Sequence, residues 1–117
     1  MLKQSDLAGF IGTENYYSHF IGNFKFTDGV HYLAEKGNCY WLLDIIGSYQ
    51  MCDKKIKNMH YQFWKLKVNK DNSALVTMRE DSDQPLVIKQ RIPYTDFPLD
   101  SVEVWMIGGV LILPSEY

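Results

Sequence analysis

The side chains of this sequence that could do acid–base chemistry are three histidines and a few carboxylates. His31 stands three residues after Asp28 and four before Glu35, so a helix through this segment would bring both carboxylates beside the imidazole and orient it. A small hydrolase or nucleotide-modifying enzyme could assemble such groups across the fold. This alternative hypothesis draws on one set of residues: His19, Asp28, His31, Asp44 and Glu14. A solvated helix surface gives the same spacing.

The motifs of common enzyme families are missing from the sequence. There is no His-x-x-x-His or His-Glu-x-x-His pair for a metal, no Gly-x-Ser-x-Gly elbow and no glycine-rich phosphate loop. The two cysteines, Cys39 and Cys52, have neither zinc-site nor Cys-x-x-Cys spacing. We therefore expect no metal and no cofactor, and we favour a non-enzymatic protein over an enzyme.

Charge is distributed unevenly along the chain, whose formal net charge is −2. Residues 54–70 contain six lysines and no acid, whereas no lysine or arginine follows Arg91. An acidic surface could steer a basic partner towards it, although the charges could equally pair with one another or be solvated. The leading hypothesis is a protein that occupies a partner's surface, and it assigns the acidic surface to four residues: Asp96, Asp100, Glu103 and Glu116.

Aromatic residues alternate with lysines in residues 61–67. In a strand, Tyr61 and Phe63 would share a face with Lys65 and Lys67. Rings beside cations can stack bases and hold phosphates, as in proteins that bind single-stranded nucleic acid. Because the domain is acidic overall, we expect a protein partner and regard nucleic acid as the less favoured alternative.

Two helices are predicted near the middle of the chain. The first begins at Thr27 or Asp28 and ends at Gly37, and the second begins after Asn38. The apolar positions of the second helix recur at three- and four-residue intervals, which predicts that it forms the centre of the core. Its predicted core residues are Trp41, Leu42, Ile45 and Ile46, with contacts to Leu33, Trp64, Leu66, Ile88 and Val104.

Beyond residue 60 the hydrophobic period changes to two, which predicts strands at 60–68, 75–79, 86–92, 102–107 and 110–113. Gly108 and Gly109 are typical of a type I′ hairpin turn. Residues 1–26 are ambiguous: we favour a helical turn at 5–10 and a short helix from Thr13 to Tyr17, with an edge strand at 17–26 as the alternative. The expected class is α+β, with N-terminal helices packed on one face of an antiparallel sheet of about five strands.

Length and composition predict one globular domain over residues 1–117. No apolar run reaches the roughly 20 residues of a membrane span, and we expect a cytoplasmic protein with reduced thiols. The strand at 102–107 is apolar on both faces, with Val104 and Met106 on one and Trp105 and Ile107 on the other. Both faces need cover, which either the helices at 27–50 with the N-terminal segment or a second copy of the chain would supply. Of the two, we expect the second copy and hence a homodimer.

The last residues are expected to turn back onto the domain. Pro114 has no amide hydrogen for a strand ladder, so residues 115–117 must leave the sheet. Tyr117 then has a large ring to bury, and we expect it to pack near Tyr94 or Phe97.

Several strings in the sequence resemble a family of small bacterial proteins of unknown function. They are Gly12-Thr13-Glu14, Tyr17-Ser18-His19, Phe26-Thr27-Asp28-Gly29-Val30, Tyr32-Leu33-Ala34-Glu35, Tyr40-Trp41-Leu42-Leu43-Asp44, Tyr94-Thr95-Asp96-Phe97-Pro98-Leu99 and Leu113-Pro114-Ser115-Glu116-Tyr117. The resemblance covers nearly the whole chain. It implies a protein often carried on phages, plasmids or other mobile DNA, and it assigns no catalytic residue. Under the leading hypothesis, the occupied surface would belong to a host or defence protein.

Overall fold

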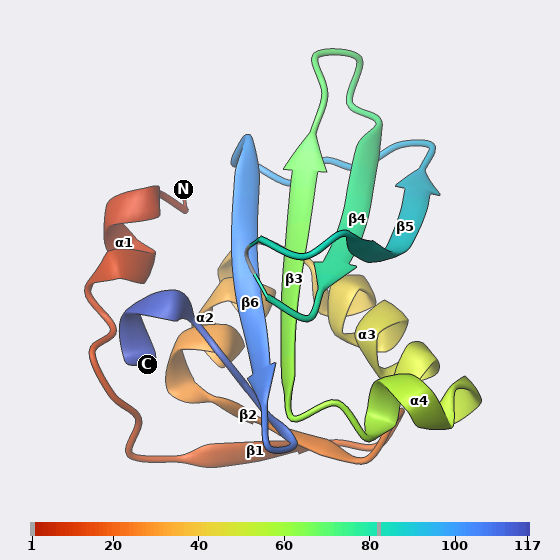
Figure 1. The fold of residues 1–117 in the computed structure, drawn as a ribbon. Helices are drawn as coiled ribbons and strands as arrows, with labels where there is room; N and C mark the ends of the chain where they lie inside the picture. Colours follow the sequence, from red (N-terminus) through yellow and green to blue (C-terminus); the bar gives the residue numbers. More distant parts are fainter. Residues whose placement is uncertain (1, 82) are drawn as a thin grey trace.

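A computed structural model describes residues 2–81 and 83–117, which form an α+β fold built on one mixed sheet (Figure 1). The strand order is β1-β2-β7-β6-β3-β4-β5, and β2 and β7 are parallel while all other neighbours are antiparallel. The elements, in chain order, are α1 (Gln4–Ala8), β1 (Tyr16–His19), β2 (Phe24–Thr27), α2 (Asp28–Lys36), α3 (Tyr40–Cys52), α4 (Lys54–Lys57), β3 (Tyr61–Val68), β4 (Ala74–Arg79), β5 (Leu86–Ile92), β6 (Ser101–Ile107), β7 (Val110–Ile112) and the 3₁₀ turn η1 (Pro114–Glu116).

The sheet is larger than the sequence predicted, and it is not purely antiparallel. The described residues give seven strands instead of about five, because residues 16–27 fold into the hairpin β1–β2 and add it beside β7. The short helix expected from Thr13 to Tyr17 does not form. The Thr13 hydroxyl instead accepts a hydrogen bond from the Asp28 backbone N–H (2.9 Å), which caps α2 rather than starting another helix.

The two central helices and the five later strands lie close to where the sequence placed them. The hairpin β6–β7 turns at Gly108 and Gly109, whose φ angles of 56° and 83° fit a type I′ turn. In the described residues, no helix is both long and apolar enough to cross a membrane.

Helices α2 and α3 lie against one face of the sheet (Figure 1). Trp64, Leu66 and Val104 point to that face and are buried, so the predicted core is confirmed there. The core side of α3 is rotated from the prediction: Leu42, Leu43 and Ile46 are buried, whereas Trp41 and Ile45 are half-buried.

The N-terminus of α2 is capped by side chains from three parts of the chain. Besides the Thr13 hydroxyl, the Thr27 hydroxyl accepts from Val30 N–H (3.4 Å), and the Glu116 carboxylate accepts from Gly29 N–H (3.3 Å). Glu116 also accepts from the Thr27 hydroxyl (2.6 Å). A carboxylate is favourable here because the helix dipole is positive at this end. These bonds hold η1 against α2.

Tyr117 turns back onto the sheet, but its ring contacts Trp105 rather than the predicted Tyr94 or Phe97. The ring centroids of Tyr117 and Trp105 are 5.7 Å apart in an edge-on arrangement, and Tyr117 keeps 76% of its surface exposed. The hydrogen bonds of Glu116 determine where the Tyr117 ring lies, because they hold Glu116 at the junction of β2 and α2.

Candidate functional site

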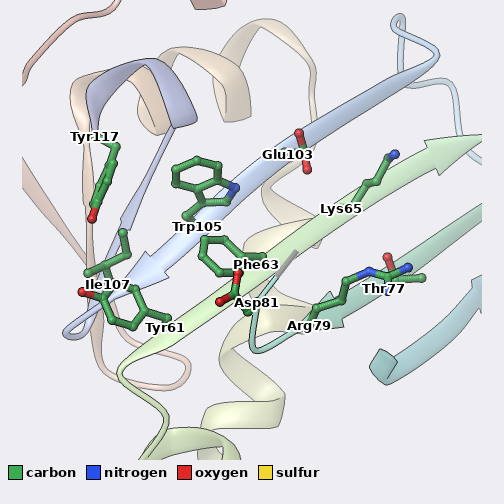
Figure 2. A pocket seen from close by; sticks show the side chains of 10 residues that line it. All are labelled: Tyr61, Phe63, Lys65, Thr77, Arg79, Asp81, Glu103, Trp105, Ile107 and Tyr117. Carbon is green, nitrogen blue, oxygen red and sulfur yellow. The ribbon is translucent and has the colours of Figure 1, made fainter. Parts of the chain in front are cut away.

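The sheet face opposite the helices carries a groove with a volume of about 590 Å³ (Figure 2). Alternate residues of β3, β4 and β6 form its floor, because side chains in a strand point to opposite faces in turn. Asp81, two residues after the end of β4, lies at the same groove (Figure 2). The lining residues are Tyr61, Phe63, Lys65, Thr77, Arg79, Asp81, Glu103, Trp105, Ile107 and Tyr117.

Four rings form what we call the aromatic platform: Tyr61, Phe63, Trp105 and Tyr117. Phe63 and Trp105 meet edge to face across β3 and β6, with centroids 5.0 Å apart. Tyr61 lies nearly parallel to Phe63 at 6.4 Å, with 41% of its surface exposed. The inner rings are thus held by packing while the outer two keep accessible faces (Figure 2).

Basic side chains lie next to the aromatic platform on the same sheet face. Lys65 and Arg79 line it beside the platform, and Lys67 lines an adjoining hollow that shares Lys65. Lys89 and Arg91 of β5 belong to this face as well, since they pair in register with Thr77 and Leu75 of β4. In the described part of the chain, neither Lys65 nor Lys67 takes part in an ion pair.

Glu103 stands between the rings and the cations. It is exposed, lies opposite Lys65 in register and is two residues from Trp105 on β6. Among the described residues, its carboxylate has no hydrogen bond or ion pair. The Trp105 indole Nε1 is buried and has no hydrogen-bond partner in the part of the chain that the structure describes. Figure 2 shows it on the side of the ring towards Glu103.

The structure pairs His19 with Asp44 and places His31 against Tyr17, whose hydroxyl donates to Asp28. His19 Nε2 is 2.9 Å from Asp44 Oδ1, which joins β1 to α3. The His31 ring stacks on Tyr17 with centroids 4.3 Å apart, and its Nε2 is 3.6 Å from Glu35 Oε1. No group of three His, Cys, Asp or Glu residues in the described chain could hold a metal ion.

Asp28 serves the local structure. Its carboxylate accepts hydrogen bonds from the backbone N–H groups of Glu14 and Asn15, from the Asn15 side chain and from the Tyr17 hydroxyl. The Glu14 amide is the main cause of the lowered pKa of Asp28. The Tyr17 pKa is raised, first by desolvation and then by Asp28. Because these donors already use the carboxylate, it is poorly placed for proton transfer to a substrate.

The four acidic residues of the leading hypothesis lie in different settings. Asp96 and Asp100 are exposed in the irregular segment before β6, and Glu103 lies in the groove. Glu116 is half-buried and accepts hydrogen bonds from three donors at the start of α2 and in η1.

The sequence placed Tyr61, Phe63, Lys65 and Lys67 on one strand face, and the structure puts all four on the face with the groove. Reasoning from sequence missed three residues that join them there: Arg79, Trp105 and Tyr117. The alternation in 102–107 did place Trp105 on the face opposite Val104. No local signal indicated that this face adjoins Phe63.

Comparison with known proteins bears on the family alone. A family model described as a family of unknown function (DUF6876) matches residues 1–117. The chain belongs to this family. The comparisons with curated proteins and with solved structures found no match. Membership in a family of unknown function, as the sequence indicated, is therefore confirmed, whereas carriage on phages or plasmids stays a prediction. The DUF6876 description assigns no chemistry to the groove.

Proposed function

We propose that this protein binds single-stranded nucleic acid in the groove, with bases on the aromatic platform and phosphates on Lys65, Lys67 and Arg79. The observation that carries the proposal is that accessible rings and unpaired lysines share one concave sheet face. Stacking of one base on an aromatic side chain contributes about 1–3 kcal/mol, and it tolerates every base.

The negative net charge does not oppose this proposal once the charges are placed on the fold. Basic side chains of β3, β4 and β5 gather on the groove face: Lys65, Lys67, Arg79, Lys89 and Arg91. Three carboxylates lie near them, Asp81 and Glu103 in the groove and Asp100 in the adjoining hollow, so the cations are in excess on this face. Screening at physiological salt confines most of a surface charge's influence to about 8–10 Å. A phosphate on this face therefore meets more local cations than carboxylates, and distant charges of the chain affect it little.

The volume of the groove also fits the proposal. About 590 Å³ lies within the roughly 300–1,000 Å³ usual for ligand sites. The adjoining hollow of about 350 Å³ shares Lys65 and extends past Lys67 to Lys70. A chain of nucleotides could thus continue from the rings along the lysines.

The test is fluorescence anisotropy with a labelled 12-nucleotide strand of mixed sequence, as DNA and as RNA, over a range of salt. The variant K65A/K67A removes two phosphate contacts, and K54A/K55A makes the same charge change on α4. Each phosphate contact on a single strand contributes a slope of about −0.7 to the log–log salt dependence, so K65A/K67A should bind about 25-fold more weakly at 0.1 M salt. K54A/K55A should bind within about twofold of wild type.

A second arm tests the rings. Y61A removes an accessible platform ring and should weaken binding about 5- to 150-fold, the equivalent of one stacked base. Y94A removes a ring that is 68% exposed but lies outside the groove, and it should have no effect. Two results would refute the proposal. The first is that neither strand binds saturably at about 50 mM salt, the low end of the range over which such slopes are measured. The second is that K54A/K55A loses binding while K65A/K67A keeps it.

A protein-binding role on a host factor, with a phage or plasmid origin, stays a second prediction. The exposed side chains of Asp96 and Asp100 favour it, since both are available to a basic partner. D96N should then lose a partner captured by the wild type and retain nucleic-acid binding, because Asp96 lines neither the groove nor the adjoining hollow. An enzyme role for His19 and Asp44 and a homodimer likewise stay predictions.

A further inference from the structure

We propose that Glu103 gives the groove a preference for guanine over other bases, an inference that rests on the nucleic-acid function proposed above. Its carboxylate lies among the groove-lining side chains, between an inner ring of the aromatic platform, Trp105, and the cation Lys65. A base stacked on the platform would present its edge to the neighbouring side chains.

A free carboxylate in this place opposes the binding of a polyanion unless it gains something from the ligand. Glu103 is exposed and has no hydrogen-bond partner among the described residues, so both oxygens can accept. Hydrogen bonds from a base edge to an ionised carboxylate are of the strong, charge-assisted kind. Sequence-specific recognition of single strands uses such contacts to the Watson–Crick edges of splayed bases.

The four bases differ in what they offer a carboxylate. Guanine presents two adjacent donors, N1–H and the N2 amino group, which can engage both carboxylate oxygens. Adenine and cytosine offer one amino group each. Uracil and thymine offer a single N3–H flanked by two carbonyl oxygens, which repel a carboxylate. The expected order is therefore guanine first, adenine and cytosine next, and uracil or thymine last.

The experiment measures binding of 12-nucleotide uridine strands that carry one guanosine, one inosine or no substitution at the centre. Inosine keeps N1–H and lacks the N2 amino group, so it isolates the second hydrogen bond. For the wild type we expect the guanosine strand to bind about 5- to 100-fold more tightly than the all-uridine strand, with inosine between them. A single guanosine cannot form a four-stranded guanine structure within one strand.

The variant E103Q should bring guanosine and inosine within about twofold of each other, because an amide offers only one acceptor oxygen to the two donors. It should bind the all-uridine strand at least as well as the wild type, since it removes a negative charge from the face. E14Q makes the same change at an exposed glutamate outside the groove and should keep the wild-type order.

The outcomes separate the two proposals. If wild type binds none of the strands, the nucleic-acid function itself fails. If wild type binds all three equally and Y61A weakens them all, the function stands and the guanine preference is wrong. If the preference survives in E103Q or disappears in E14Q, Glu103 is not its source. The wild-type comparison needs no variant, so it stays decisive even if E103Q is unstable.

Discussion

Replacing Glu116 with alanine should destabilise the fold, although this residue is polar and lies next to the last residue of the sequence. Its carboxylate accepts from the Thr27 hydroxyl at 2.6 Å, from Leu113 N–H at 2.9 Å and from Gly29 N–H at 3.3 Å. A hydrogen bond to a charged group contributes about 1.5–3 kcal/mol, and loss of an ordinary helix cap costs about 0.5–2 kcal/mol. Water replaces part of this at a half-buried site, so we expect Glu116→Ala to lower the free energy of unfolding by about 2–3 kcal/mol.

This change can be measured by thermal unfolding followed by circular dichroism. An unfolding entropy of about 2.1 cal/mol/K per residue predicts a fall in Tm of about 8–12 °C for a chain of this length. Asp96→Ala is the control, because Asp96 is exposed and outside the hydrogen bonds described above. Its Tm should stay within about 2 °C of wild type.

A double-mutant cycle tests the proposed contact itself. A Cβ at position 29 would lie 2.6 Å from Glu116 Oε1 and 2.7 Å from Leu113 Cδ1. Gly29→Ala therefore displaces the same carboxylate, and the double variant should cost about 1 kcal/mol less than the two single variants together. Strict additivity, or a Glu116→Ala variant as stable as wild type, would show that the carboxylate does not cap α2.

Three further predictions follow from burial and hydrogen bonding. Ile46→Ala should cost about 2–5 kcal/mol in urea denaturation, and half-buried Ile45→Ala less than half as much; equal costs would mean that the core side of α3 is misassigned. At pH 8, the exposed thiol of Cys52 should react with a chromogenic disulfide in the folded protein. Cys39 should react only on unfolding, because burial raises the pKa of its thiol to about 12. A rapidly reacting thiol in folded Cys52→Ser would contradict this. Hydrogen bonds from backbone N–H groups lower the pKa of Asp28 below its ordinary 3.8. The charged carboxylate therefore stabilises the fold fully above pH 3.8, and this stabilisation disappears as the pH falls through the folded-state pKa. In urea denaturation, the loss of stability in Asp28→Asn should be largest near neutral pH and shrink in acid, and a loss independent of pH would contradict this.

Much of the local structure was predictable because it follows from residues close together in the sequence. The helix that begins after Thr27, the helix through Leu42 and Ile46, and the turn at Gly108 and Gly109 each depend on spacing or on backbone freedom within a few residues. The segment 16–27 was assigned wrongly in part because its aromatic residues fit several patterns. Its strands gain their stability from β7, which lies more than 80 residues later.

The sequence alone determined the strand face that carries Tyr61, Phe63, Lys65 and Lys67, since alternation along one strand is a local property. The rest of the groove was decided by tertiary structure. Pairing of β3 with β6 brings Trp105 beside Phe63, and pairing with β4 adds Arg79.

Glu116 shows the same division. Its charge, next to the end of the sequence, indicated an exposed acidic surface, whereas the fold directs it to the Gly29 amide 87 residues earlier. Contacts of such sequence separation are set by which arrangement buries the most apolar surface while pairing the backbone polar groups. That balance belongs to the whole chain, and no single segment carries it.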